Sequence, residues 1–342
     1  MERKGGDRQG GGPATVVVLG ANSFSGQDFA DLLLDDPGYR VIGVSRSPER
    51  GPAFLRYRER NVRSALRYYQ LDMNREMREL LHLLDEERPE LVVNFAAQSE
   101  VAPSWEWPEH WFQTNCVALA QLVNHLRRRN YLRRYLHVSS PEVYGTCSGI
   151  VREDAPLNPS TPYAASKAAA DLLLATYCRQ FGFPLVTVRA TNVYGARQQL
   201  YKIIPRTVIS LRQGRIVELH GGGRAVKSYI HIRDVSRGEK AILERGRVGQ
   251  VYHLSPSAGI AVRDVVRRIA ELLGRRFEEV VRDVAERPGQ DAAYLIDSTR
   301  AREEFGWHPE VDLERGLREV IGWVERYWDE IHRLPLEYEH RP

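Results

Sequence analysis

The sequence predicts a doubly wound α/β fold, in which helices cover both faces of a parallel sheet. Strand-like runs alternate with helical patterns through the first half of the chain, at residues 14–19, 40–44, 67–71, 90–96, 134–138 and 184–191. These runs are rich in valine, isoleucine and leucine and lack polar alternation, so both faces of the sheet are expected to be buried. The first run also leads into a glycine-flanked turn and then an apolar helix, which is typical of such folds.

The turn after the first strand predicts a phosphate-binding site. Free backbone amides and the positive end of a helix dipole suit a pyrophosphate, and small residues let the backbone approach it. The alternative is a tight turn without a ligand. The residues of the turn that we expect to bind a dinucleotide cofactor are Gly20, Asn22, Ser23, Phe24 and Gly26.

The end of the second strand indicates which dinucleotide binds. An NAD site has a carboxylate there for the ribose diol, whereas this chain has Ser45 and Arg46. A serine and an arginine can hold a 2′-phosphate, so we predict NADP in preference to NAD, although Arg46 could instead be solvated. Asp72, after the third strand, is placed to meet the adenine amino group or to cap its own loop.

The second half of the chain has a different pattern from Asn192 onward. Helices are predicted at 203–213, 262–273 and 313–327, a strand at 215–220, and a strand at 251–254 that returns to the first sheet. The first residues are charged and glycine-rich without an apolar core. The predicted parts are a disordered tail (1–13), a Rossmann dinucleotide-binding domain (14–193, with the return of about 229–254) and a smaller α/β C-terminal substrate-binding lobe (194–228 and 255–342).

Composition excludes several classes of protein. The 342 residues are 42% hydrophobic, enough for a full core. The 49 basic and 45 acidic residues are interspersed, so we expect no nucleic-acid partner. No segment is long and apolar enough to span a membrane. Cys116, Cys147 and Cys178 lack metal-ligand or disulfide spacing, so we expect no metal site and a reducing, cytoplasmic location.

Tyr163 and Lys167 form the most informative pair in the sequence. Four-residue spacing on a helix places a phenol beside an ammonium, and an adjacent cation favours the phenolate by lowering the pKa of the tyrosine. Such a pair can act as a general base on a sugar hydroxyl, although most pairs with this spacing are ordinary surface residues. The residues around the pair decide whether it is catalytic. Among them, Ser140 and Glu142 follow the fifth predicted strand directly.

Together these residues resemble the extended short-chain dehydrogenase/reductases that act on nucleotide sugars, and within them the dTDP-glucose and GDP-mannose 4,6-dehydratases. The resemblance covers nearly the whole chain. Besides the residues already named, the motifs that carry it are Asn94-Phe-Ala-Ala-Gln-Ser99, Thr114-Asn115, Arg189-Ala-Thr-Asn-Val-Tyr-Gly195, Tyr229-Ile-His-Ile-Arg-Asp234 and Arg287-Pro-Gly-Gln-Asp291.

The resemblance implies a role for each motif. Ser140 and Tyr163 would contact the sugar C4 hydroxyl, and Tyr163 would take its proton as hydride leaves C4. Lys167 would hold the nicotinamide ribose, with Asn115 supporting it through hydrogen bonds, and Ala96 would line the cofactor site. The residues implied in binding the nucleoside-diphosphate sugar are Gln98, Ser99, Asn192, Lys202, Lys227 and Arg287.

Glu142 separates the branches of this family. A carboxylate can remove the C5 hydrogen of a C4 ketone and let the C6 hydroxyl leave, which gives a 4-keto-6-deoxy sugar. We therefore predict a nucleotide-sugar 4,6-dehydratase. The alternative is a C4-epimerase or a uronic-acid decarboxylase, because Pro141 stands where dTDP-glucose dehydratases place the aspartate that protonates the leaving hydroxyl. Glu142 or a water would then move that proton.

Two smaller expectations also follow from the resemblance. Lys227 stands where the family usually has an arginine, and it keeps the charge but loses the bidentate grip on a diphosphate. The predicted helices 161–180 and 115–126 carry more apolar residues than one core-facing stripe requires, among them Ala168, Leu172, Leu173 and Tyr177. Family members pair these two helices across a twofold axis, so we expect a homodimer through a four-helix bundle.

Overall fold

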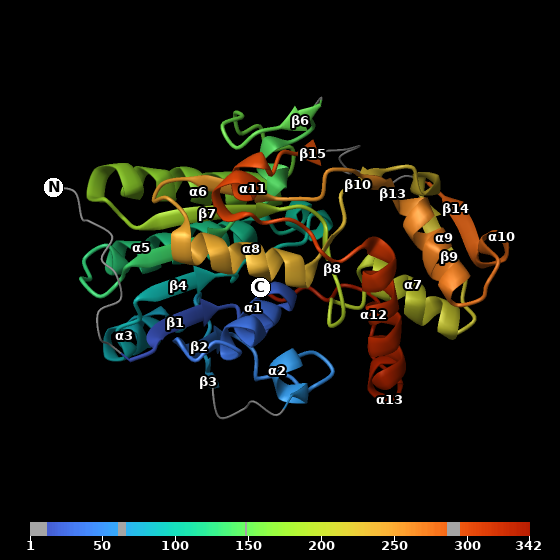
Figure 1. Ribbon diagram of the computed structural model, residues 1–342, viewed down its shortest axis with the longest axis horizontal. Helices are drawn as coiled ribbons and strands as arrows, with labels where there is room; N and C mark the ends of the chain where they lie inside the picture. Colours follow the sequence, from blue (N-terminus) through green and yellow to red (C-terminus); the bar gives the residue numbers. More distant parts are fainter. Residues whose placement is uncertain (1–11, 61–65, 148, 286–294) are drawn as a thin grey trace.

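The computed structural model describes residues 12–60, 66–147, 149–285 and 295–342. Its centre is a seven-stranded sheet in the order β12-β7-β5-β4-β1-β2-β3, with every neighbouring pair parallel (Figure 1). The predicted doubly wound fold is therefore confirmed, including the return of the strand after the second lobe. The strands are β1 Ala14–Leu19, β2 Tyr39–Ser45, β3 Leu66–Gln70, β4 Leu91–Asn94, β5 Arg134–Val138, β7 Leu185–Ala190 and β12 Val251–Leu254.

Helices cover both faces of this sheet, which explains why its strands show no polar alternation. Along β1, Val16 and Val18 pack into one core with α1, α8 and α11, while Val17 and Leu19 pack into another with α3, α5 and α6. All four side chains are buried. The helices are α1 Phe24–Leu34, α8 Ile232–Arg245 and α11 Thr299–Phe305 on the first face, and α3 Met77–Glu87, α5 Leu119–Leu126 and α6 Pro162–Phe181 on the second.

A third core lies outside the sheet, at the end of the molecule where Figure 1 shows α7, α9 and α12. Its elements are α7 Ile203–Arg212, α9 Val262–Leu272, α10 Phe277–Val280, α12 Leu313–Arg326, α13 Trp328–Ile331 and the parallel pair β9 Val217–His220 and β14 Val281–Val284. The predicted elements of this half begin and end within two residues of the observed ones. The domain boundaries stay a prediction, and most of the predicted disordered tail (1–13) lies outside the described residues.

Short elements complete the part of the chain that the structure describes. Three further pairs of short strands are β6 Ile150–Val151 with β15 Leu295–Ile296, β8 Val193–Tyr194 with β11 Ile230–His231, and β10 Val226–Lys227 with β13 Ile260–Ala261. The short helices are α2 Arg56–Glu59, α4 Pro108–Phe112, the 3₁₀ helices η2 Ala102–Trp105, η4 Pro141–Tyr144 and η5 Gly221–Gly223, and the π-helix η3 Gln113–Ala118.

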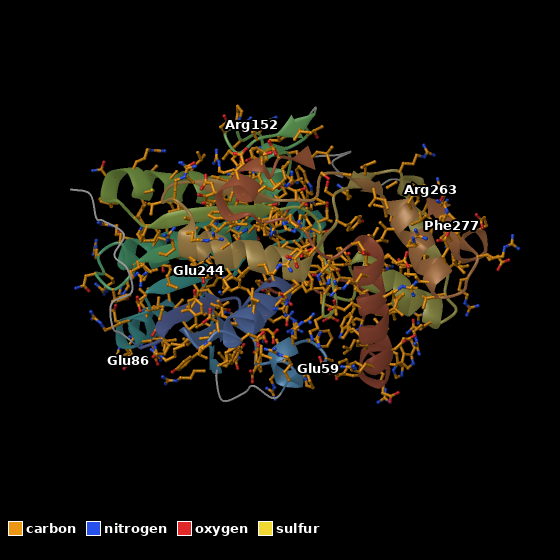
Figure 2. All side chains as sticks on the ribbon, viewed as in Figure 1. Glu59, Glu86, Arg152, Glu244, Arg263 and Phe277 are labelled. Carbon is orange, nitrogen blue, oxygen red and sulfur yellow. The ribbon has the colours of Figure 1, made fainter. Side chains whose placement is uncertain are left out.

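Charged side chains join the third core to the sheet. Glu59, labelled in Figure 2 at the end of α2, forms ion pairs with both Arg197 and Arg326. Farther along α12, Glu319 pairs with His231 at 3.1 Å. At the opposite side of the third core, Arg263 lies over the ring of Phe277, at 5.9 Å from its centroid (Figure 2). Among the described residues, no helix is both long and apolar enough to cross a bilayer.

Candidate active site

The predicted catalytic residues meet at the carboxyl edge of the sheet, where β5 ends and α6 begins. Thr161 caps α6 by accepting a hydrogen bond from the backbone amide of Ala164 at 3.1 Å, and a proline occupies the first helical position. This start places Tyr163 and Lys167 in the first two turns, on the buried side of the helix. Ligands in doubly wound folds bind beyond this edge.

Ser140 and Glu142 are held by the tight helix η4. The Ser140 hydroxyl accepts a hydrogen bond from the Glu142 amide at 3.2 Å, and Pro141 fits the first helical position, where no amide donor is needed. The Ser140 side chain also hydrogen-bonds to Tyr163, and the Glu142 carboxylate raises the pKa of that tyrosine. The structure therefore brings Ser140, Glu142 and Tyr163 together.

Burial dominates the pKa of Tyr163. Desolvation raises the pKa of its phenol above the usual value, and the carboxylates of Glu142, Glu100 and Asp171 add to the rise, whereas the hydrogen bond with Ser140 opposes it. The expectation that Lys167 lowers the pKa of Tyr163 stays a prediction.

Lys167 lies in a polar pocket of its own. Its ammonium donates to the backbone oxygen of Val138 at 2.8 Å. Burial lowers the pKa of Lys167 to about 8, while the nearby carboxylate of Asp171 acts in the opposite direction. That carboxylate accepts from the Ser139 hydroxyl at 2.6 Å and pairs with Arg189 at 2.7 Å.

Asp171 is a residue that sequence reasoning missed. It follows Lys167 by four residues, as Lys167 follows Tyr163, so all three lie along one side of α6. Behind it, Arg189 hydrogen-bonds to the hydroxyl of Tyr144, which in turn contacts Nε2 of His253 at 2.7 Å. The four-residue spacing could have found Asp171, whereas its partners come from other strands and left no local pattern.

Asn115 ties the loop after β4 to α6. Its side-chain oxygen accepts from the Gln98 amide at 2.9 Å, and its Nδ2 donates to the Gln98 carbonyl at 3.0 Å and to the Ser166 hydroxyl at 2.9 Å. The expected support of Lys167 is thus indirect, through the neighbouring Ser166. Asn115 lies in the π-helix η3, a form often found at functional sites.

The glycine turn has the form that a dinucleotide phosphate needs. Gly20 has a φ of +83°, and Ser23 caps α1 by accepting from the Gly26 amide at 3.0 Å. A Cβ added at Gly26 would lie 2.2 Å from the Gly20 carbonyl oxygen, so the turn closes only with glycine there. The helix beginning at Phe24 points its positive end toward this edge of the sheet. These features fit a pyrophosphate.

Other predicted cofactor residues have partners within the protein. The Asn22 side chain donates to the carbonyl of Pro48 at 2.6 Å, and the backbone amide of Asn22 donates to the Ser45 hydroxyl at 2.9 Å. The Asp72 carboxylate accepts from the Asn74 amide at 2.8 Å, which favours the loop-capping role. Ala96 donates its amide to the Asn94 side chain at 3.0 Å. These contacts fix the shape of the adjacent loops.

The predicted substrate residues are partly brought together. Lys202 stands directly before α7 and forms an ion pair with Glu100 at 2.8 Å, and the Tyr201 hydroxyl donates to the same carboxylate at 3.1 Å. Gln98 is buried, Ser99 is exposed, and Asn192 and Lys227 are half-buried, whereas Arg287 lies outside the described residues. Glu100 was not predicted, since a lone glutamate after a serine gives no signal.

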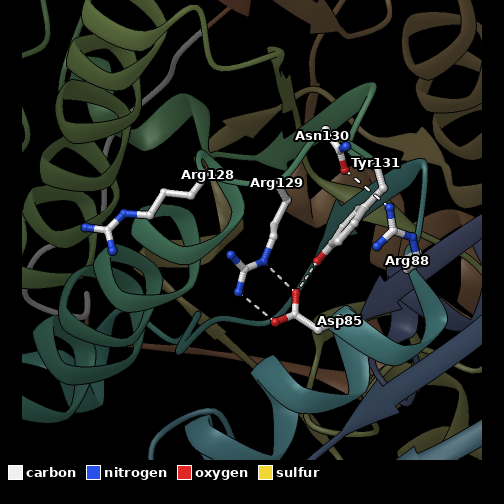
Figure 3. A pocket seen from close by; sticks show the side chains of 6 residues that line it. All are labelled: Asp85, Arg88, Arg128, Arg129, Asn130 and Tyr131. Atoms are coloured by element: carbon white, nitrogen blue, oxygen red, sulfur yellow. Dashed lines mark hydrogen bonds and ion pairs between the residues drawn. The ribbon is translucent and has the colours of Figure 1, made fainter.

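A basic pocket of about 460 Å³ lies elsewhere (Figure 3). Its residues come from the segments that enter β4 and β5, at the opposite edge of the sheet from Tyr163. The Asp85 carboxylate is already bound by Arg129 at 2.6 Å and by the Tyr131 hydroxyl at 3.0 Å (Figure 3). The pocket is therefore separate from the candidate active site. No cluster of metal-ligating side chains occurs within the described ranges.

The parallel sheet, the glycine turn and the paired Tyr163 and Lys167 define a short-chain dehydrogenase/reductase. A family model described as GDP-mannose 4,6 dehydratase matches residues 17–320. The chain belongs to this family, and thus to the extended members that act as nucleotide-sugar dehydratases and epimerases, as its motifs indicated.

Individual relatives agree with this assignment. A dTDP-glucose 4,6-dehydratase of Xanthomonas campestris pv. campestris is 33% identical over 70% of this chain and 74% of the relative. Another of that name from Haemophilus influenzae is 27% identical over 90% and 97%. The crystal structure of the dTDP-glucose 4,6-dehydratase DesIV from Streptomyces venezuelae, with NAD bound, superposes with a TM-score of 0.84 at 31% identity, over 93% of this chain and 100% of that one.

Proposed function

We propose that this protein is a nucleotide-sugar 4,6-dehydratase, which converts a nucleoside-diphosphate hexose into its 4-keto-6-deoxy product. The observation that carries this function is Glu142, held by η4 close enough to Tyr163 to raise the pKa of its phenol. Tyr163 and the carboxylate of Glu142, together in one site, supply the proton transfers at C4 and C5 that the reaction needs. The relatives that carry the dehydratase name support the same activity.

The residues of the glycine turn would hold the cofactor. Gly20, Ser23 and Gly26 form the cradle for its pyrophosphate, and Lys167 is the cation nearest to the catalytic phenol along α6. A bound nicotinamide dinucleotide supplies a reversible hydride acceptor, which takes hydride from C4 and returns it to C6 without net redox change. NADP stays the dinucleotide that Ser45 and Arg46 favour in the sequence, and NAD is the one bound in DesIV.

Each side chain of the site then has one task. Tyr163 takes the proton of the C4 hydroxyl. Ser140, which is hydrogen-bonded to the phenol of Tyr163, orients that hydroxyl. The buried ammonium of Lys167, fixed by the Val138 carbonyl, stabilises the negative charge that develops on Tyr163. Glu142 removes the C5 proton once C4 is a ketone.

Pro141 leaves the departing C6 hydroxyl without the neighbouring aspartate of dTDP-glucose dehydratases. We propose that Glu142 delivers the proton it took from C5 to this hydroxyl, which leaves as water. Glu142 then takes a proton from solvent and returns it to C5 as hydride reaches C6, and Tyr163 releases the proton of the C4 hydroxyl to solvent, so the steps sum to the loss of one water. Glu100 lies near Tyr163 as well, but its carboxylate is engaged by Lys202 and Tyr201, so it is a poorer proton donor.

Substrate binding would rearrange one contact. Lys202 is a proposed ligand of the diphosphate, together with Gln98, Ser99, Asn192, Lys227 and Arg287, and it is paired with Glu100. A diphosphate carries more charge than a carboxylate and offers more acceptor oxygens, so it can replace Glu100 on the lysine. The base and sugar of the substrate depend on the second lobe.

A C4-epimerase or a uronic-acid decarboxylase is the second candidate, and Pro141 is the observation that favours it. Without an acid for the C6 hydroxyl, a C4 ketone could be reduced again at C4 or could lose a carboxylate at C5. Neither route requires Glu142 as a base, so the two candidates differ in their use of that residue.

We also propose a homodimer through η3, α5 and α6. Leu172 and Phe181 of α6 are 59% and 49% exposed, and Val117 of η3 is 44% exposed, although each is apolar. α6 packs against η3 and α5, so these residues belong to neighbouring elements. A reducing, cytoplasmic location stays a prediction from the three cysteines, which form no disulfide among the described residues.

The test is incubation of the purified protein with dTDP-, UDP- and GDP-hexoses in deuterated buffer. A dehydratase gives a 4-keto-6-deoxy product, detected by mass spectrometry as loss of water, with solvent deuterium incorporated. Recovery of C4 epimers without deuterium at C5 would select the epimerase. Release of carbon dioxide from a nucleotide uronate would select the decarboxylase.

A further inference from the structure

Residues 338–342, named here the closing segment, return to the carboxyl edge of the sheet. The chain end marked C lies in the middle of Figure 1, not at the border of the molecule. The closing segment contacts three separate parts of the site: the loop after β2, the loop after β4 with its short helices, and Tyr201 before α7. Its position therefore bears on what binds there.

Aromatic stacking holds the closing segment in place. The ring of His340 is parallel within 4° to Trp107 at 4.7 Å and within 13° to Trp111 at 5.3 Å. Its Nε2 also contacts Nδ1 of His110 at 2.8 Å. Tyr338 meets Tyr201 edge to face at 5.4 Å. Each such aromatic pair adds to the stability of the closing segment beyond the apolar area that it buries.

Backbone oxygens of the same segment occupy one donor predicted for the substrate, Gln98, and one predicted for the dinucleotide, Arg46. The Arg341 carbonyl accepts from Gln98 Nε2 at 2.7 Å and from Arg46 Nη1 at 3.0 Å. The Pro342 carbonyl accepts from the same Arg46 nitrogen at 2.7 Å. Arg46 is the residue that the sequence assigns to a 2′-phosphate, and here its guanidinium already donates to two backbone oxygens of the closing segment.

We infer that the closing segment competes with the 2′-phosphate of NADP for Arg46 and thereby favours NAD. A phosphate is a stronger acceptor than a carbonyl, but it must first displace a segment that His340 and Tyr338 hold in place. NAD has no group for Arg46 to bind and can leave that contact intact. The sequence indicated NADP from Arg46 alone. The partner of Arg46, the carbonyl of Arg341, lies 295 residues away in the chain and was not foreseen.

The test measures binding, not turnover, because the inference rests on the dinucleotide site of the proposed function. The unaltered protein and its His340→Ala variant are titrated by calorimetry with NAD, NADP, AMP and adenosine 2′,5′-bisphosphate, without sugar substrate. We expect His340→Ala to bind NADP and the bisphosphate about tenfold more tightly, about 1.4 kcal/mol, with NAD and AMP changed less than about threefold. If the closing segment of the variant has left its place and the ratio of the affinities for NADP and NAD is still that of the unaltered protein, the inference is overturned.

Arg46→Ala completes a thermodynamic cycle. The gain in NADP affinity should vanish in the double variant with His340→Ala, because the competition requires the guanidinium. A gain that persists without Arg46 contradicts the inference. His308→Ala, at an exposed histidine in another loop, is the matched control and should change neither affinity.

Tryptophan fluorescence reports whether the segment has left, since His340 stacks on two indoles. Should His340→Ala leave the emission unchanged, the Tyr338→Ala/His340→Ala variant removes both aromatic anchors. Unchanged emission in that variant as well would show that these rings do not hold the segment, which also overturns the inference. If the unaltered protein binds neither NAD nor NADP, this result would instead contradict the proposed function.

Discussion

Tyr163 presents the main chemical problem at the residue scale, because a base must give up its own proton first. Burial and the carboxylates of Glu142, Glu100 and Asp171 raise the pKa of its phenol, whereas the hydrogen bond from Ser140 opposes them. The site as described therefore favours the neutral phenol. The buried charge of Lys167, with its pKa lowered to about 8, is the group of the site that can offset this cost when the proton moves.

Replacing Tyr163 with phenylalanine tests this role. We expect Tyr163→Phe to lower kcat by about 10²–10⁴-fold, the usual contribution of a positioned acid or base. Binding of the dinucleotide, measured by calorimetry, should not change, since the glycine turn is untouched. Tyr135→Phe, a change at a tyrosine buried in the sheet, is the matched control. Activity within a factor of about three of the unaltered protein would remove Tyr163 from the mechanism.

Glu142→Gln separates elimination from the oxidation that precedes it. The amide keeps the shape of the side chain but cannot take the C5 proton. We expect no 4-keto-6-deoxy product and no solvent deuterium at C5, measured by mass spectrometry, while Glu142→Asp retains part of the activity. Full dehydration by Glu142→Gln would favour a water as the base.

Single residues also show where sequence reasoning ends. Ser140, Glu142, Tyr163 and Lys167 were predictable, because short spacings on β5 and α6 place them at one edge of the sheet. The partners of Arg46 were not, since both lie at the far end of the chain. The raised pKa of Tyr163 depends on burial, which the sequence of one helix does not report.

At the scale of elements, α6 links catalysis to stability. Asp171 lies one turn beyond Lys167, and its carboxylate pairs with the buried guanidinium of Arg189. Their side chains are only 7% and 4% exposed, so the pair is shielded from solvent. The same carboxylate favours the charged form of Lys167. One side chain therefore supports both the helix and the ammonium of the site.

Asp171→Asn should weaken both functions. Breaking a buried ion pair leaves one charge without its partner, so we expect a loss of about 3–5 kcal/mol in the free energy of unfolding. The pKa of Lys167 should fall further, because a group that raises it is gone. The alkaline limb of the pH profile of kcat/KM should therefore shift to lower pH. Thr176→Ala, on an exposed part of the same helix, should shift neither the unfolding curve nor the profile.

Glu239 of α8 gives a second element-scale prediction. It is fully buried, and burial together with the charge of Asp28 raises its pKa well above the usual value. A carboxyl with a raised folded pKa adds stability below its unfolded pKa of about 4, and that stability is lost as pH rises through the folded pKa. Glu239→Gln removes the titrating group.

We therefore expect Glu239→Gln to match the unaltered protein in Tm near pH 4, and to exceed it increasingly as the pH rises. Differential scanning calorimetry across this range makes the comparison. Glu303→Gln, at an exposed glutamate of α11, is the control. A Tm difference that is constant with pH would contradict the assigned titration.

The limits of the predicted elements have local causes. The strands were predicted closely, since buried β-branched runs end where the polar loops begin. The first helix begins at Phe24, five residues before the apolar run that indicated it, because Ser23 supplies the cap. The π-helix η3 was not foreseen, since its widened turn is imposed by the contacts of Asn115 with Gln98 and Ser166.

At the scale of the whole molecule, two large cores flank the sheet, a small one gathers around Tyr144, and another stands apart, joined to the sheet cores by charged contacts such as those of Glu59. Apolar side chains outside these cores lie together on neighbouring helices. Leu172 and Phe181 on α6 and Val117 on η3 are about half exposed, whereas Leu174 of α6 and Leu122 of α5 are buried. Exposed apolar groups clustered on neighbouring helices indicate an interface.

The proposed dimer can be tested at this surface. We expect light scattering to give twice the chain mass for the unaltered protein at micromolar concentration, because stable interfaces bury about 1,200–2,000 Å² and two helices per subunit can supply that area. Leu172→Glu places a charge in the predicted centre of the bundle and should give a monomer with an unchanged circular dichroism spectrum. Ile216→Glu changes a residue that is 49% exposed near the third core and should leave the dimer intact. A monomeric unaltered protein, or a Leu172→Glu dimer, would exclude the four-helix bundle.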